Sequence, residues 1–136
     1  MNANPNNVIK ILIVDDSEFS RKVVAKILVE EGYNVVGEAS NATEAVEILN
    51  SNQGIHIILI DIIMPDVNGI ELARRIHKSF EDSSIVMMSS LSQDHIVIEA
   101  ISAGAVDFIK KPFERQTLLD SIEKLSREFI KKTQGK

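Results

Sequence analysis

Short apolar runs alternate along the chain with stretches in which apolar residues recur every three or four positions. The runs cover residues 9–14, 34–38, 55–60, 85–88 and 105–109, and three of them are nearly continuous in Ile, Val, Leu and Met. Such runs are typical of strands that are buried on both faces of a sheet. The pattern therefore predicts five strands, each followed by a helix.

Each intervening stretch presents an apolar face with the period of an α-helix. The predicted faces are Phe19, Val23, Ile27 and Leu28 in the first helix, Ala42, Ala45, Val46 and Leu49 in the second, Ile70, Ala73 and Ile76 in the third, Val97, Ala100, Ile101 and Gly104 in the fourth, and Leu118, Ile122, Leu125 and Phe129 in the fifth. Because strands and helices alternate, we expect an α/β fold with helices on both faces of a parallel sheet.

Residues that favour helix ends support these boundaries. Asn41 followed by Glu44 resembles a capping box, and Ser92 suits the N-cap of the fourth helix. Gly32 and Gly104 lie where the first and fourth helices should end.

Composition narrows the class of protein. The length of 136 residues fits one domain, and a hydrophobic share of 44% supplies a core. The net charge of -5 argues against general nucleic-acid binding, and the absence of cysteine excludes disulfides and thiolate metal sites. No apolar run approaches the roughly 18 residues of a membrane span, and the polar start is not a secretory signal. We expect a cytoplasmic protein with a flexible arm over residues 1–7, one domain over 8–131 and a flexible tail over 132–136.

Acidic residues follow two of the predicted strands. Asp15 and Asp16 follow the first strand, where a role as helix cap is an alternative, and Asp61 closes the third. A lone carboxylate in an apolar stretch is costly to bury without a positive partner. Because the carboxyl ends of parallel strands share one edge, the three carboxylates should meet there. Oxygen ligands of this kind favour a hard cation such as Mg²⁺.

A hydroxyl group and an ammonium group are predicted at the same edge. The fourth strand ends in Ser89 and Ser90, and the fifth ends in Lys110 and Lys111. A metal and a lysine neutralise phosphate charge, a hydroxyl donates to it, and a carboxylate can itself accept the phosphoryl group. The combination indicates phosphoryl chemistry.

Four motifs at these strand ends resemble those of the receiver domains of two-component response regulators, most closely the stand-alone chemotaxis-type regulators. They are residues 14–17 (Val-Asp-Asp-Ser), residues 61–65 (Asp-Ile-Ile-Met-Pro) with Asp66 and Gly69, residues 88–90 (Met-Ser-Ser) and residues 111–113 (Lys-Pro-Phe). The resemblance covers about residues 8–130. It implies a flavodoxin-like (βα)5 doubly wound fold whose five parallel strands have the order 2-1-3-4-5.

The resemblance also implies a role for each matching acid. Asp61 would be the phosphoacceptor. Asp61 and Asp16 would bind Mg²⁺ directly, Asp15 would bind it mostly through water, and the backbone carbonyl of Ile63 would be a further ligand.

The remaining matches imply residues that bind the phosphoryl group or respond to it. Lys111 would pair with the phosphoryl oxygens, and the peptide bond between Lys111 and Pro112 would be cis. Ser89 and Phe108 would be switch residues. Ile63 and Ser90 depart from the residues that many relatives carry at these positions, and both would flank the path of the water that removes the phosphoryl group.

The resemblance implies a phosphorylation-controlled binding module rather than an enzyme. A sensor histidine kinase or a phosphotransfer protein would supply the phosphoryl group. A downstream protein, in chemotaxis a flagellar motor switch protein, would bind the face formed by the fourth helix, fifth strand and fifth helix. That face includes Val97, Ile98, Val106 and Phe108. No nucleic acid or membrane is expected as a partner.

Two alternatives stay open. The first is a phosphorelay intermediate. The second is an Mg²⁺-dependent phosphatase with an aspartate nucleophile, although enzymes of the haloacid dehalogenase type usually carry Asp-x-Asp on the first strand and a cap domain. His56, His77 and His95 lack the spacing of metal ligands and are expected on the surface.

Overall fold

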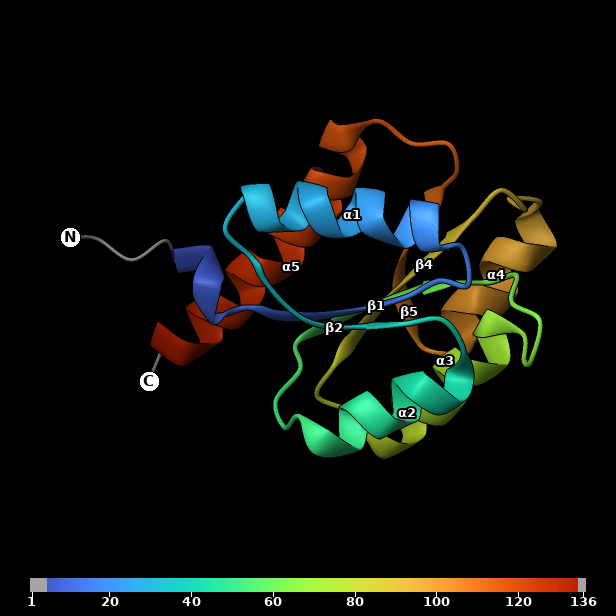
Figure 1. The fold of residues 1–136 in the computed structure, drawn as a ribbon, viewed down its shortest axis with the longest axis horizontal. Helices are drawn as coiled ribbons and strands as arrows, with labels where there is room; N and C mark the ends of the chain where they lie inside the picture. Colours follow the sequence, from blue (N-terminus) through green and yellow to red (C-terminus); the bar gives the residue numbers. More distant parts are fainter. Residues whose placement is uncertain (1–4, 135–136) are drawn as a thin grey trace.

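The computed structural model describes residues 5–134 and contains the five predicted strands and five predicted helices (Figure 1). In chain order the elements are the 3₁₀ turn η1 (Pro5–Val8), β1 (Lys10–Val14), α1 (Glu18–Glu30), β2 (Asn34–Ala39), α2 (Ala42–Ser51), β3 (Ile57–Asp61), α3 (Gly69–Ser79), β4 (Ser84–Ser89), α4 (Asp94–Ser102), β5 (Ala105–Lys110) and α5 (Arg115–Gln134).

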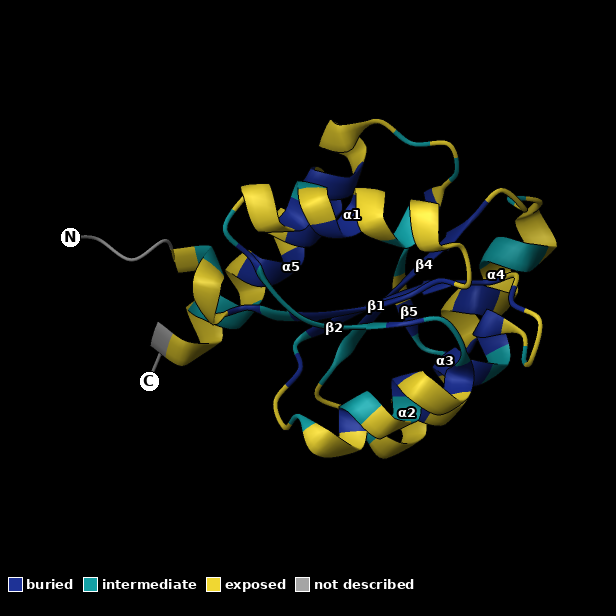
Figure 2. Cartoon of the chain, viewed as in Figure 1, coloured by how far each residue is buried: buried dark blue, intermediate teal, exposed yellow. Residues whose placement is uncertain are grey.

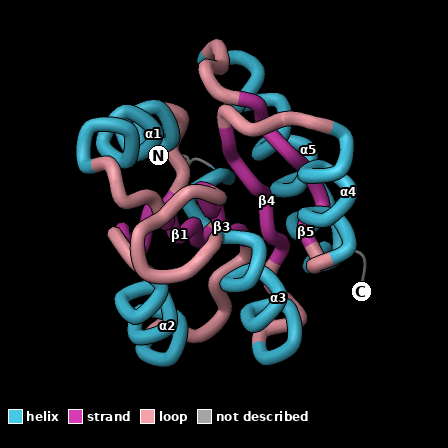
Figure 3. Tube along the Cα trace, turned by 90° about the vertical axis from the view of Figure 1, so that its right-hand side faces the viewer, coloured by secondary structure: helices cyan, strands magenta, loops and turns pink. Residues whose placement is uncertain are grey.

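The five strands form one parallel sheet in the order β2-β1-β3-β4-β5. Helices α1 and α5 cover one face, and α2, α3 and α4 cover the other (Figure 1). The expected flavodoxin-like fold and strand order are therefore confirmed. Figure 3 looks onto the carboxyl edge of the sheet, where the loops after β1 and β3 lie next to each other.

Between their first and last residues the central strands β1, β3 and β4 are entirely apolar, because both of their faces are covered. Leu12 and Val14 of β1 point into the core under α2, α3 and α4, while Ile11 and Ile13 point into the core under α1 and α5. Side chains alternate between the faces of a strand, so a strand between two helical layers needs apolar residues throughout. These three strands are accordingly the most deeply buried of the sheet, whereas the edge strands β2 and β5 are only partly buried (Figure 2).

The predicted apolar face of α1 is confirmed at Ile27 and Leu28, which pack against the core, and is wrong at Phe19 and Val23. The buried residues of this helix are Val24, Ala25 and Leu28, whereas Phe19 is 80% exposed and Val23 is also exposed. The stripe that faces the sheet is shifted by one position around the helix. Phe19 belongs to the first turn, next to the site at the carboxyl edge, and is free to face solvent.

The predicted face of α4 is confirmed only at its centre. Ala100 is fully buried, but Ile101 is largely exposed. This nine-residue helix packs mainly on the edge strand β5, so only a narrow stripe is covered. The predicted faces of α2, α3 and α5 are buried or half-buried as expected.

Three of the predicted helix ends are confirmed and one is wrong. Asn41 Oδ1 accepts a hydrogen bond of 2.8 Å from the Glu44 N–H at the start of α2. Gly32 and Gly104 have φ values of 88° and 119°, in the left-handed region that favours glycine after a helix. Ser92 is not the N-cap of α4, because the helix begins at Asp94 and its N-cap residue is Gln93.

Helical structure extends further at both ends than the sequence indicated. Within the predicted arm, Pro5–Val8 forms a 3₁₀ turn, and α5 continues through the predicted tail to Gln134. Residues 1–4 and 135–136 lie outside the described residues, so the flexibility of the arm and tail stays a prediction. Within residues 5–134, no helix combines the length and apolar character needed to cross a membrane.

His56 is half-buried, not a surface residue as predicted. Its Nδ1 accepts a hydrogen bond of 3.0 Å from the Lys10 N–H, and its ring lies edge-on to Phe129 at 4.9 Å between centroids. The side chain therefore contacts both the first residue of β1 and the C-terminal half of α5. Because Nδ1 is the acceptor, the ring is neutral and carries its proton on Nε2.

We predict that His56 makes the stability of the fold depend on pH. Burial, and next the charge of Lys10, lower the pKa of His56 below its ordinary value of 6.5. The unfolded chain therefore takes up a proton at a higher pH than the folded protein does. The free energy of unfolding should fall as the pH drops below about 6.5.

Urea unfolding of the wild type and of His56→Asn at about pH 7.5 and about pH 5.5 measures this effect. Asparagine offers an oxygen to the Lys10 N–H but does not titrate. Lowering the pH should reduce the free energy of unfolding of the wild type more than that of the variant. An equal difference between the two proteins at both pH values would contradict the prediction.

Candidate functional site

Three carboxylates meet at the carboxyl edge of the sheet. Asp15 and Asp16 follow β1 and Asp61 ends β3, and one oxygen of each lies within 4.8 Å of the others. Asp15 is fully buried and Asp61 is 9% exposed, whereas Asp16 is open to solvent. The clustering predicted from the strand ends is therefore confirmed.

The alternative role of these acids as helix caps is not what the structure contains. The N-cap of α1 is Ser17, whose Oγ accepts a hydrogen bond of 3.2 Å from the Ser20 N–H. Asp15 instead accepts from the Ser17 N–H through Oδ1 at 2.9 Å. This bond fixes the orientation of the Asp15 side chain and leaves Oδ2 for other partners.

Lys111 reaches the acids from the loop between β5 and α5. Its Nζ lies 3.0 Å from Asp15 Oδ2 and 3.4 Å from Asp61 Oδ2. The backbone N–H of Lys111 donates to the Ser89 carbonyl at 2.8 Å. The peptide bond between Lys111 and Pro112 is cis, as the resemblance implied.

Burial and crowding perturb the pKa of Asp61. Burial is the largest cause and raises the pKa of this carboxyl, the charge of Asp15 raises it further, and the charge of Lys111 opposes both. The Ile63 N–H also donates to the carboxylate and lowers the pKa. One ammonium among three carboxylates leaves the edge negative, which favours the binding of a cation.

The donor set fits Mg²⁺. It consists of carboxylate oxygens, the ligands that this hard ion prefers. Asp16 also borders an open groove of about 780 Å³ through which an ion and its water could enter. The groove is lined by Asp16, Ser40, Asn41, Thr43, Glu44, Pro65 and Asp66.

The loop after β3 is held in place by contacts that the sequence analysis missed. Asp66 Oδ2 accepts a hydrogen bond of 3.0 Å from the Ala42 N–H, which ties the loop to the first turn of α2. Gly69 packs directly on the backbone of Asp61 and Ile62, and a Cβ at this position would collide with the Asp61 carbonyl oxygen. An aspartate after Pro65 is an ordinary turn residue, so nothing in its sequence context indicated the tether.

The two predicted switch residues lie close to this edge. Ser89 is fully buried at the end of β4, and its Oγ accepts a hydrogen bond of 3.0 Å from the Leu91 N–H. Phe108 on β5 is half-buried against the core that α2, α3 and α4 cover. Their movement on phosphorylation stays a prediction.

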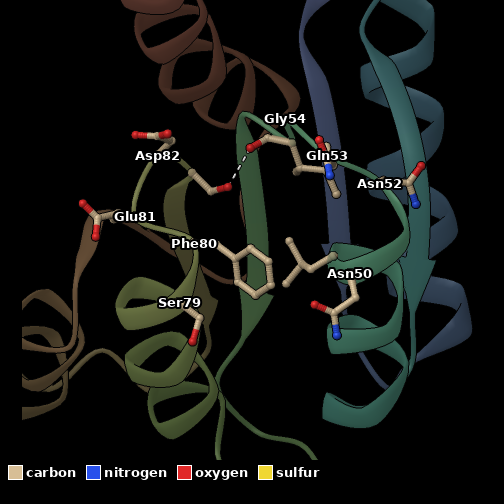
Figure 4. Close-up of a pocket in the computed structure, with 11 residues that line it drawn as sticks. Asn50, Asn52, Gln53, Gly54, Ser79, Phe80, Glu81 and Asp82 are labelled. Carbon is tan, nitrogen blue, oxygen red and sulfur yellow. Dashed lines mark hydrogen bonds between the residues drawn. The ribbon is translucent and has the colours of Figure 1, made fainter.

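A different hollow, of about 400 Å³, lies where α2 and α3 end (Figure 4). Phe80 faces its interior, and Asn50, Asn52 and Gln53 lie on the side where α2 ends (Figure 4). Its lining contains no lysine, arginine or histidine, so it lacks the opposite charges that meet at the carboxyl edge. We therefore take the acidic edge as the candidate site.

Comparison with known proteins agrees with this geometry. The sequence matches the response regulator receiver domain over residues 11–123. It is 41% identical to chemotaxis protein CheY of Thermotoga maritima over 118 residues, which is 87% of this chain and 98% of that protein. It is 41% identical to CheY of Bacillus subtilis over 115 residues, 85% of this chain and 95% of that protein.

Solved structures give the same result. In the CheX–CheY–BeF3–Mg²⁺ complex from Borrelia burgdorferi, the matching chain has a TM-score of 0.81 at 31% identity, covering 86% of this chain and 88% of that one. A CheY-like receiver domain protein from Methanospirillum hungatei has a TM-score of 0.83 at 30% identity, covering 91% and 98%. The chain therefore belongs to the response regulator receiver domain family, and within it is similar to the CheY chemotaxis proteins.

Proposed function

We propose that the protein accepts a phosphoryl group on Asp61, with Mg²⁺, from a sensor histidine kinase or a phosphotransfer protein in the cytoplasm. The observation that carries this proposal is the meeting of Asp15, Asp16, Asp61 and Lys111 at one edge of the sheet. A reactive carboxylate lies there beside the positive charge that a phosphoryl group needs. The magnesium and beryllium fluoride named with the Borrelia structure support the same chemistry.

In this reaction an Asp61 carboxylate oxygen attacks the phosphorus of a phosphohistidine. The new O–P bond forms as the N–P bond breaks, and the nitrogen keeps the bonding electron pair. Lys111, already 3.4 Å from Asp61 Oδ2, pairs with the phosphoryl oxygens. Asp16, Asp61 and the Ile63 carbonyl would hold Mg²⁺, with Asp15 acting through water, and the ion would supply further neutralising charge. Hydrolysis of the mixed anhydride later returns the carboxylate and releases phosphate.

We predict that acetyl phosphate adds one phosphoryl group to the wild-type protein in the presence of Mg²⁺ and adds none to Asp61→Asn. The amide of that variant is a poor nucleophile, whereas Asp82→Asn removes an exposed acid at the opposite edge and should label normally. Mass spectrometry of the intact protein and of its peptides measures the result. A label that persists in Asp61→Asn, for example on Ser89 or Ser90, would refute the assignment.

We predict that Asp16→Asn weakens Mg²⁺ binding at least about tenfold, because the affinity for hard cations follows the number of charged oxygen ligands. Glu44→Gln is the matched control, since Glu44 is an exposed acid that borders the same groove. Titration of each protein with Mg²⁺, followed by NMR shifts of the backbone amides, gives the affinities. Equal losses of Mg²⁺ affinity in the two variants would show that the loss comes from the change in net charge rather than from a lost ligand.

Phosphorylation then shifts the equilibrium between two packing arrangements around the edge strand β5. New phosphoryl oxygens attract the Ser89 hydroxyl, the loop before α4 moves, and Phe108 packs into the vacated space. Such a shift needs contacts that favour one packing over the other, and couplings of this kind are typically about 1–3 kcal/mol. Phe108 is half-buried in this structure, so an inward shift would bury it further.

The output surface is the face of α4, β5 and α5, and its partner in chemotaxis would be a flagellar motor switch protein. Ile98 and Val106 are 64% and 53% exposed there, and Ile101 is exposed as well. Exposed aliphatic side chains grouped on adjacent elements favour protein binding. The chemotaxis relatives support the choice of partner.

We predict that Ile98→Glu weakens binding of the beryllium fluoride-activated protein to the motor switch protein of the same genome by at least about tenfold, as expected for a buried interface residue. Val29→Glu is the matched control, because Val29 is 58% exposed on α1, outside this face. Titration calorimetry measures both affinities. Equal binding by the two variants would place the interface elsewhere.

Two alternative functions have distinct signatures. A phosphorelay intermediate would pass its phosphoryl group to a histidine of a further protein. An Mg²⁺-dependent phosphatase would turn over more than one equivalent of a small phosphate ester. Neither has support from the Thermotoga and Bacillus relatives, which are chemotaxis proteins.

A further inference from the structure

Lys111 has a third hydrogen-bond partner, Ser20, that neither the motifs nor the acid cluster indicated. The Ser20 Oγ accepts from Lys111 Nζ at 3.2 Å, a shorter contact than the 3.4 Å from Nζ to Asp61 Oδ2. An ammonium has three N–H groups, and here they meet oxygens of Asp15, Ser20 and Asp61. The three partners come from the loop after β1, from α1 and from the end of β3.

Both ends of the contact between Ser20 and Lys111 are fixed to the backbone. Ser20 lies in the first turn of α1, where its N–H donates to the cap residue Ser17. The Lys111 N–H donates to the Ser89 carbonyl. The two side chains border the same hollow, of about 340 Å³, between α1 and the loop after β5. The Ser20 hydroxyl is therefore an acceptor in a fixed position. It restrains the Lys111 side chain, which otherwise has four freely rotating bonds.

We propose that Ser20 is a positioning residue that sets where the Lys111 ammonium lies, and that it thereby controls how fast Asp61 is phosphorylated. This inference rests on the proposed function. Asp15 and Ser20 take two of the three N–H groups, so the third is aimed at the Asp61 oxygen where the phosphoryl group forms. Preset charge of this kind lowers the barrier of phosphoryl transfer because it needs no reorganisation during the reaction.

Ser20→Ala should slow phosphorylation by acetyl phosphate about threefold to tenfold, the range expected for the loss of one hydrogen bond. Ser20→Thr keeps the hydroxyl and should stay within about twofold of the wild type. Ser51→Ala removes an exposed hydroxyl at the end of α2 and is the matched control. Circular dichroism verifies that each variant is folded.

A second readout does not depend on phosphorylation. In the metal-free protein, ¹⁵N NMR of the Lys111 ammonium should give slowly exchanging protons in the wild type, in Ser20→Thr and in Ser51→Ala, and faster exchange in Ser20→Ala. An unchanged rate or an unchanged ammonium signal in Ser20→Ala overturns the inference, as does a threonine variant that is as slow as the alanine variant. If the wild type takes up no phosphoryl group, the proposed function fails, and the ammonium signal alone decides whether Ser20 holds Lys111.

Discussion

The site depends on one electrostatic balance, in which a single ammonium compensates two carboxylates that the fold buries side by side. Asp15 and Asp61 each disfavour the charge of the other, and burial adds to this cost. Lys111 contacts both and opposes the cost without cancelling it. With Asp16 as a third carboxylate at the surface, the edge keeps an excess of negative charge. This excess favours the binding of a divalent cation at the edge.

The sheet holds these charged residues in place because the backbone at the site continues its hydrogen-bond ladder. The Asp15 N–H donates to Ala39, the Ile62 N–H to Met88 and the Lys111 N–H to Ser89. Each bond lies at or just beyond the end of a strand, so the loops that carry the charged side chains start from fixed positions. Residues almost a hundred positions apart in the sequence are thereby held within hydrogen-bond distance.

The sequence predicts the site residues that end or directly follow strands. It fails for side chains whose burial depends on tertiary contacts with residues remote in the chain. The positions of Asp15, Asp61 and Lys111 follow from apolar runs that stop at charged residues, because parallel strands bring their carboxyl ends together. The exposure of Phe19 could not be predicted, since a shift of one position around α1 leaves the helical period unchanged. The partial burial of His56 could not be predicted, since its two partners, Lys10 and Phe129, are remote in the chain.

The tether between Asp66 and α2 has a practical consequence. The carboxylate that accepts the Ala42 N–H belongs to the loop that follows β3. Any rearrangement of that loop must alter the chemical environment of this single amide, which lies in a regular helix and outside the charged cluster. The protein thus carries a built-in spectroscopic marker, through which the state of the acidic edge can be followed without a label or a substitution there.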